Sequence, residues 1–209
     1  PVMFAMLLIA LIAPALFGLV NSEVGARKTP FRGRGWAIAT LVGIVLLWGW
    51  REVERQNAIQ LAQTQDYGDS GSAQVTRVFA SPSPVNPFRW HMIVETPNFY
   101  QLATADTLQG TVATNKESDI FYKPPTTLAT LVAKRTWLGR VYLDWSSFPL
   151  VTQADTSFEG LTTVTFRDLR FMYDVSFLSG RKKPPLSGEV VLNADRHVVK
   201  IEMDGHVQH

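Results

Sequence analysis

The sequence predicts two N-terminal transmembrane α-helices followed by a mainly antiparallel β (α+β) soluble domain with one short helix. Three observations predict this fold class. Residues 1–20 contain no charged side chain, and residues 35–50 form a second uncharged run. From residue 73 onward, short β-like runs alternate with turn-forming residues. Charged residues are concentrated between the two apolar runs and after the second one.

The first apolar run, residues 1–20, has the length of a membrane span. About 20 apolar residues, rising about 1.5 Å each, cross a hydrocarbon core of about 30 Å. Pro14 would kink this helix, which membrane helices tolerate. The alternative is a signal peptide, but the positive n-region and short apolar core of such a peptide are absent. The pattern therefore favours a spanning helix.

The second run, residues 35–50, is short for a span but has typical flanks. Arg34 and Arg51 bracket it, and tryptophans occupy both ends. Arginines that reach toward the interfaces and an aromatic belt are typical of membrane helices. The alternative is a buried core helix, which would not need this flanking pattern. We therefore expect a second span.

The loop between the two runs predicts the orientation. Residues 21–34 carry four basic residues against the single Glu23, and basic loops of this kind stay in the cytoplasm. The chain after Trp50 would then lie on the opposite side. This predicts a multi-pass protein of the bacterial inner (plasma) membrane with an extracytoplasmic C-terminal domain and the lipid bilayer as a partner.

Composition also predicts the domain boundaries. Residues 1–65 comprise the two transmembrane helices, the cytoplasmic loop 21–34 and an emerging amphipathic helix over 51–65. Residues 66–72 contain two glycines and several turn formers and form a linker. Residues 73–209 form the β-rich extracytoplasmic domain.

Short runs of β-forming residues predict the strands of this domain. Residues 161–168 alternate apolar and polar side chains with the period of two that a half-buried strand shows. Residues 126–135 form the one predicted helix, after two prolines and with a threonine as cap. Arg196 and His197 mark a hairpin, which favours antiparallel pairing. The predicted strands are 74–80, 89–96, 99–105, 110–114, 120–122, 141–144, 161–168, 171–178, 189–192 and 198–203.

The charge distribution argues against nucleic-acid binding. Residues 66–209 hold 14 of the 20 basic and 15 of the 18 acidic residues, so the predicted domain is nearly neutral. The basic cluster 181–183 precedes two prolines and indicates an exposed turn. A nucleic-acid binder would concentrate basic residues on its folded domain. The chain has no cysteine, which excludes disulfides and thiolate metal sites.

The segment 81–90 is the most distinctive part of the predicted domain. Three prolines within residues 82–87 give a stiff extended entry into a strand. Asn86 can brace a turn through its side chain, and Trp90 is large enough to anchor a sheet. The alternatives are a structural strand entry, which we favour, and the rim of a binding groove.

The ionisable residues of the domain do not predict a metal site. His91 and Glu95 would lie about 13 Å apart on a strand, too far apart to chelate one ion. Near the other end of the domain, Asp168 and Arg170 can pair where a strand bends. No metal or other cofactor is therefore expected in this chain.

Several segments together resemble a known family. They are residues 51–54, 84–91, 94–96, 99–100, 143–145, 148–149 and 168–171. In this order they resemble the C-terminal part of the YdjM-like, LexA-binding, inner-membrane metal-dependent hydrolases. The first residue is Pro1 rather than Met, which fits a part of a longer chain. The resemblance implies a divalent metal in the full-length protein, held by a His and Asp motif on earlier helices that residues 1–209 lack.

Two functional hypotheses follow. In the first, the chain is the accessory or substrate-contacting region of such a hydrolase, acting on a lipid-linked or envelope substrate. In the second, it is a non-catalytic, membrane-anchored domain that binds an envelope partner or has a structural role. Neither hypothesis assigns a catalytic residue. The candidate binding or family-motif residues are Asn86, Arg89, Trp90, His91, Glu95, Tyr100, Asp168 and Arg170.

Overall fold

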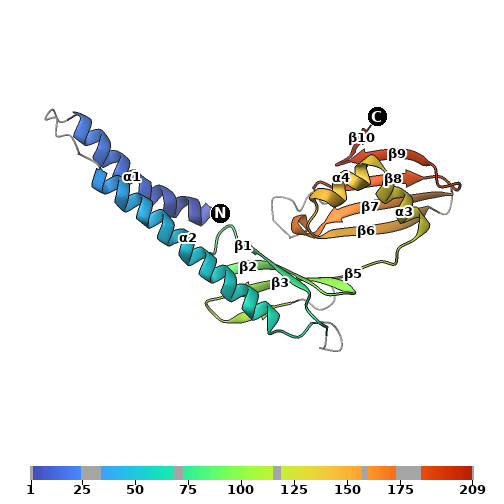
Figure 1. The fold of residues 1–209 in the computed structure, drawn as a ribbon, viewed down its shortest axis with the longest axis horizontal. Helices are drawn as coiled ribbons and strands as arrows, with labels where there is room; N and C mark the ends of the chain where they lie inside the picture. Colours follow the sequence, from blue (N-terminus) through green and yellow to red (C-terminus); the bar gives the residue numbers. More distant parts are fainter. Residues whose placement is uncertain are drawn as a thin grey trace. The chain divides into compact units, whose positions relative to one another are not determined.

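The structure is a computed structural model that describes residues 2–24, 34–67, 73–114, 119–156, 160–172 and 185–208. The chain forms two compact units (Figure 1). The first comprises Pro1–Pro97 and Gln101–Ile120, and the second comprises Asn98–Tyr100 and Phe121–His209. The predicted cytoplasmic loop 21–34 and linker 66–72 lie largely outside the described residues, as do the basic cluster 181–183 and most of the predicted strand 171–178.

Two helices begin the first unit. Helix α1 covers Val2–Val24, and α2 covers Arg34–Gln63 and lies against α1 (Figure 1). Both helices expose many large apolar side chains in their described parts, such as Phe17 and Leu46. The second half of α2 is different, because it packs on strands of the first sheet. Its Ala58 and Ala62 lie one helical turn apart and are fully buried.

The structure contradicts the predicted membrane spans. Within the described ranges, none of the helices is both long and apolar enough to cross a bilayer. The predictions of two transmembrane helices and of a multi-pass inner-membrane protein with an extracytoplasmic domain are therefore wrong. In α2 the physical reason is visible. Its apolar run, which ends at Trp50, continues without a break into the charged residues 51–55, and this part of the helix packs on the first sheet.

The first sheet has five strands, and its pairs β1–β2 and β3–β4 are antiparallel. Strand β1 lies at its edge, in the order β1-β2-β3-β4, and β5 pairs with β3. In the register of β1 and β2, Ala80 is opposite Met92 and Pro82 is opposite Trp90. Side chains two apart share a face of a strand, so these four lie on the same face. The strands are β1 (Arg77–Pro82), β2 (Arg89–Glu95), β3 (Phe99–Asp106), β4 (Thr111–Ala113) and β5 (Ile120–Tyr122).

The second unit contains another five-stranded sheet, in the order β10-β9-β8-β7-β6. Its strand pairs are antiparallel, so the sheet is a meander with helices α3 (Leu128–Arg135) and α4 (Trp137–Trp145) on one face (Figure 1). Leu138 and Tyr142 of α4 pack on Val164 and Phe166 in the core of this unit. The strands are β6 (Pro149–Thr156), β7 (Leu161–Asp168), β8 (Gly188–Leu192), β9 (Val198–Met203) and β10 (His206–Gln208).

The prediction of a single short helix is also wrong, because the predicted strand 141–144 belongs to α4. Thr136 ends α3 and begins α4: its N–H donates to Ala133 O, and its hydroxyl accepts from Gly139 N at 3.1 Å. A Cβ on Gly139 would lie 2.3 Å from Ala133 O. Glycine therefore permits the close approach of the two helices, a contact that a strand pattern cannot reveal.

The mainly antiparallel β content is confirmed. The strands predicted over 89–96, 99–105, 161–168 and 198–203 match β2, β3, β7 and β9 closely, and the predicted hairpin at Arg196 joins β8 to β9. Strands β6 and β10 were not predicted. A short 3₁₀ helix, Leu169–Phe171, follows β7 where a strand was expected to begin.

Candidate functional site

Three contacts join helix α2 to two loops of the first sheet, the loop before β2 and the loop after β3. Arg51 Nη1 donates to Pro87 O at 3.0 Å. Thr107 Oγ1 donates to Glu54 Oε2, in a contact that is short for a hydrogen bond. Trp50 meets Phe88 edge to face, with ring centroids 5.7 Å apart. The segments 51–54 and 87–90, which are far apart in the sequence, thus contact each other.

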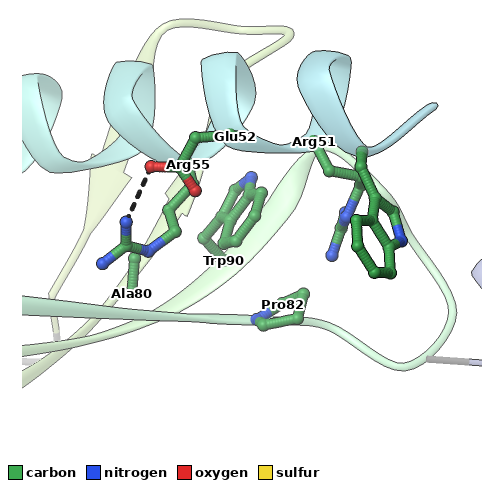
Figure 2. A pocket seen from close by; sticks show the side chains of 7 residues that line it. Arg51, Glu52, Arg55, Ala80, Pro82 and Trp90 are labelled. Atoms are coloured by element: carbon green, nitrogen blue, oxygen red, sulfur yellow. Dashed lines mark hydrogen bonds and ion pairs between the residues drawn. The ribbon is translucent and has the colours of Figure 1, made fainter. Parts of the chain in front are cut away.

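Beside these contacts, a cavity of about 670 Å³ opens between α2 and strands β1 and β2 (Figure 2). We call this cavity the α2 groove. The helix contributes residues three or four positions apart, which places them on one face. The strands contribute the side chains of the opposing wall. The lining residues are Trp48, Arg51, Glu52, Arg55, Ala80, Pro82 and Trp90.

Arg51 places a positively charged guanidinium in the α2 groove. Its guanidinium carbon lies 4.6 Å from the centroid of the Trp90 ring, in cation–π geometry. Burial lowers the pKa of Arg51, and Glu54 partly offsets this shift by raising it. Within the described ranges no carboxylate forms an ion pair with Arg51. The structure therefore presents a partly desolvated cation without a paired anion.

The second arginine of the groove is already paired. Arg55 Nη1 lies 2.9 Å from Glu52 Oε1, and Gln56 Nε2 donates to the same oxygen at 2.6 Å. The hydrogen bond from Gln56, followed by those from Arg55, lowers the pKa of Glu52. Figure 2 shows this pair on one side of Trp90 and Arg51 on the other. Glu52 is thus directed to Arg55 and Gln56 rather than to Arg51.

Trp90 forms the floor of the groove and is only 2% exposed. Its indole Nε1 has no hydrogen-bond acceptor among the described residues. A buried donor without a partner costs about 1–3 kcal/mol. Four other buried polar atoms are likewise unpaired in the described part of the chain, but none belongs to a residue that lines the groove.

The sequence predicted several functional residues in the first unit, and of these only Trp90 lines the groove. Asn86 accepts a hydrogen bond from Phe88 N at 2.9 Å and thereby shapes the turn before β2. Arg89 is exposed at the start of β2. Glu95 forms an ion pair with Arg77 at 2.9 Å. His91 is half-buried, and its pKa is lowered by burial and then by Arg89.

The remaining predicted residues belong to the second unit. Asp168 is buried and forms an ion pair with Arg170 at 2.8 Å. Burial raises the pKa of Asp168, but hydrogen bonds from Arg170 and Ser146 outweigh it, so the net shift is downward. Tyr100 is buried and donates from its hydroxyl to Pro149 O at 3.5 Å. These contacts join elements of the fold and do not form a catalytic arrangement.

The structure also bears on metal binding. In the part of the chain that the structure describes, no three residues of the types His, Cys, Asp and Glu lie close enough together to hold a metal ion. The fold and the groove therefore define an α+β protein with a cavity lined by arginine and tryptophan. No protein-family model matches the chain, and no match was found among curated proteins or solved structures. The resemblance to metal-dependent hydrolases stays a prediction.

Sequence reasoning missed most of the α2 groove, although a signal was present. Trp48, Arg51, Glu52 and Arg55 recur at intervals of three and four, the spacing of one helix face. Considered without the strands, Trp48 and Arg51 were interpreted as the aromatic and basic flank of a membrane span. That interpretation hid their contacts with the strand residues Pro82 and Trp90.

Proposed function

We propose that the first unit is a binding module and that the α2 groove binds an organic anion with an apolar body. The observation that carries the proposal is the position of Arg51. Its guanidinium lies on the face of Trp90, is partly desolvated, and has no ion-pair partner in the described part of the chain. A carboxylate or phosphate would supply the missing charge, because both accept paired hydrogen bonds from guanidinium groups.

The other lining residues support the apolar half of this ligand. Trp48, Pro82 and Ala80 present hydrocarbon or ring surface to the cavity. A cavity of about 670 Å³ falls within the usual size range of small-molecule sites, about 300–1,000 Å³. An amphiphile can therefore place its apolar part against these side chains while its anionic group reaches Arg51.

Binding fits the groove better than catalysis. The lining residues include no serine, threonine, cysteine or histidine, so a nucleophile paired with a base is not found among them. A ligand-binding groove is compatible with the substrate-contacting region of a hydrolase and with the binding form of the non-catalytic hypothesis, whereas the structural form of that hypothesis does not require one. A lipid-linked or envelope substrate that carries an anionic group would have the chemistry proposed here.

Titration with short amphiphiles tests the proposal. Hexanoate and hexyl phosphate share a six-carbon chain with hexanol, and hexanol lacks the charge. We expect saturable binding of at least one anion to the full chain by calorimetry, with hexanol at least about tenfold weaker, a difference of about 1.4 kcal/mol. Equal binding of all three compounds would contradict the proposal.

Two charge-removing variants locate the site. Arg51→Gln is expected to weaken binding of the anion about tenfold or more, because a hydrogen bond to a charged group contributes about 1.5–3 kcal/mol. Arg89→Gln is the matched control. It removes the same charge from the same unit, but Arg89 does not line the α2 groove. Loss of binding in the Arg89 variant alone would instead support the site residues predicted from the sequence.

A further inference from the structure

We infer that the indole N–H of Trp90 donates a hydrogen bond to the anionic head group of the ligand. The head group would then lie on the floor of the α2 groove, within reach of both Arg51 and Trp90, with the apolar part directed along Trp48 and Pro82. This inference rests on the proposed function and adds the orientation of the ligand. It makes Trp90 a specificity-determining residue for an oxyanion, either a carboxylate or a phosphate.

The missing acceptor of the Trp90 nitrogen is the first observation that supports this contact. The side chain is 2% exposed, yet its Nε1 has no acceptor among the described residues. Buried tryptophan N–H groups usually find a partner. Figure 2 shows the indole nitrogen on the edge of the ring that is turned toward α2, the helix that forms the opposite wall of the groove. The donor edge of the ring is therefore turned toward the helix that carries Arg51.

The lining side chains of the groove also offer more hydrogen-bond donors than acceptors. Arginine and tryptophan side chains donate hydrogen bonds and do not accept them, and alanine and proline side chains do neither. Glu52 is the one lining side chain that accepts, and its Oε1 already receives bonds from Arg55 and Gln56. Arg51 Nη1 donates to Pro87 O, and a ligand can supply acceptors for the remaining N–H groups of Arg51 and for Trp90. A ligand rich in acceptor oxygens and poor in donors fits this arrangement.

The geometry brings the guanidinium of Arg51 close to the indole of Trp90. Arg51 stacks on the ring of Trp90 with its guanidinium carbon 4.6 Å from the centroid, and the N–H lies in the plane of that ring. One oxyanion can then accept from the ring edge with one oxygen and from the guanidinium with another. Of the groove-lining cations, only Arg51 stacks on Trp90, and Arg55 is paired with Glu52.

Nuclear magnetic resonance of the indole N–H groups tests the inference directly. The chain has six tryptophans, and in the ¹⁵N-labelled chain each gives an indole resonance. Trp90→Phe identifies the Trp90 signal by its loss. Should that variant fail to fold, the other five tryptophans are replaced in turn and the signal is assigned by elimination. Saturating hexanoate or hexyl phosphate should move the Trp90 proton downfield, and the anion that reaches half of its full effect at the lower concentration carries the preferred head group.

Affinity gives a second, independent readout. Trp90→Phe keeps an aromatic ring beneath Arg51 but lacks the N–H, and we expect it to weaken anion binding about tenfold to a hundredfold. Trp137→Phe is the matched control, because it makes the same change at a side chain that is 59% exposed and does not line the groove. It should retain most of the affinity.

The outcomes separate the two proposals. If the anions bind but the Trp90 resonance does not move and Trp90→Phe binds as tightly as the unchanged chain, the head-group contact is wrong and the proposed function stands. If neither anion binds the unchanged chain more tightly than hexanol, both proposals fail. If the resonance moves and Trp90→Phe loses affinity while Trp137→Phe does not, the inference is supported.

Discussion

Ser146 donates a hydrogen bond from its hydroxyl to the buried carboxylate of Asp168 at 2.8 Å. Ser146 is the C-cap of α4, and Asp168 is the last residue of β7. The same carboxylate accepts from Ser147 N at 3.1 Å and pairs with Arg170. One side chain thus joins the end of a helix, the end of a strand and the 3₁₀ turn that follows it.

Replacing this carboxylate should destabilise the second unit. Asp168→Asn keeps the size of the side chain but removes the charge that balances Arg170. We expect a loss of about 2–4 kcal/mol in the free energy of unfolding, because breaking a buried pair leaves a charge uncompensated. Urea denaturation measures the change. Asp144→Asn on the exposed face of α4 is the control and should stay within about 0.5 kcal/mol; an equal loss in both variants would contradict the assigned role.

The same carboxylate should make stability depend on acid pH. The pKa of Asp168 is lowered in the folded chain, so the unfolded chain binds the proton at a higher pH than the folded chain. The stabilisation is therefore complete above the ordinary Asp pKa of about 3.9 and is lost as the pH falls through the lower folded value. Between pH 5 and pH 2, unfolding free energies should fall less steeply for Asp168→Asn than for the unchanged chain. Parallel curves would rule out this contribution.

The close approach of α3 and α4 gives another prediction. In Gly139→Ala the new methyl group would meet the Ala133 carbonyl oxygen and the backbone of Lys134. Relieving this clash requires the two helices to separate, at an expected cost of about 1–3 kcal/mol or more. Gly49→Ala has nothing within 4 Å of its added Cβ and should be neutral or stabilising by up to about 1 kcal/mol. Thermal unfolding of both variants tests the contrast.

The strands were predictable where apolar and polar side chains alternate in the sequence. Strand β7 alternates in this way and was predicted with its observed bounds, although Val164, Thr165 and Phe166 are buried in succession. The prediction of a strand over 141–144 was wrong because Val141 and Leu143 are compatible with either a strand or a helix. The cap at Thr136 and the tight contact at Gly139 favour the helix α4. Strand β6 begins at a proline and mixes Gln153 and Asp155 with apolar residues, so it lacks a strong β pattern.

The candidate site was less predictable, because its parts come from different segments of the sequence. The size of Trp90 and its position in the proline-rich segment identified it as a candidate. No sequence pattern, however, predicts that Arg51 stacks on it. That contact depends on α2 continuing past Trp50 and packing on β1 and β2. The same residues give a membrane-flank pattern when they are considered without the strands. Long-range packing of this kind is the information that a local pattern lacks.

His91 provides the last prediction, on the first sheet. It is half-buried in β2, and its pKa is lowered first by burial and then by the neighbouring Arg89. The unfolded chain therefore binds a proton at a higher pH than the folded chain, so this residue lowers stability as the pH falls below the ordinary histidine value of about 6.5. The His91 ring protons should titrate below that value in a magnetic resonance experiment. Between pH 7.5 and pH 5, His91→Gln should lose less stability than the unchanged chain, whereas a ring that titrates at or above pH 6.5 would contradict the assigned burial.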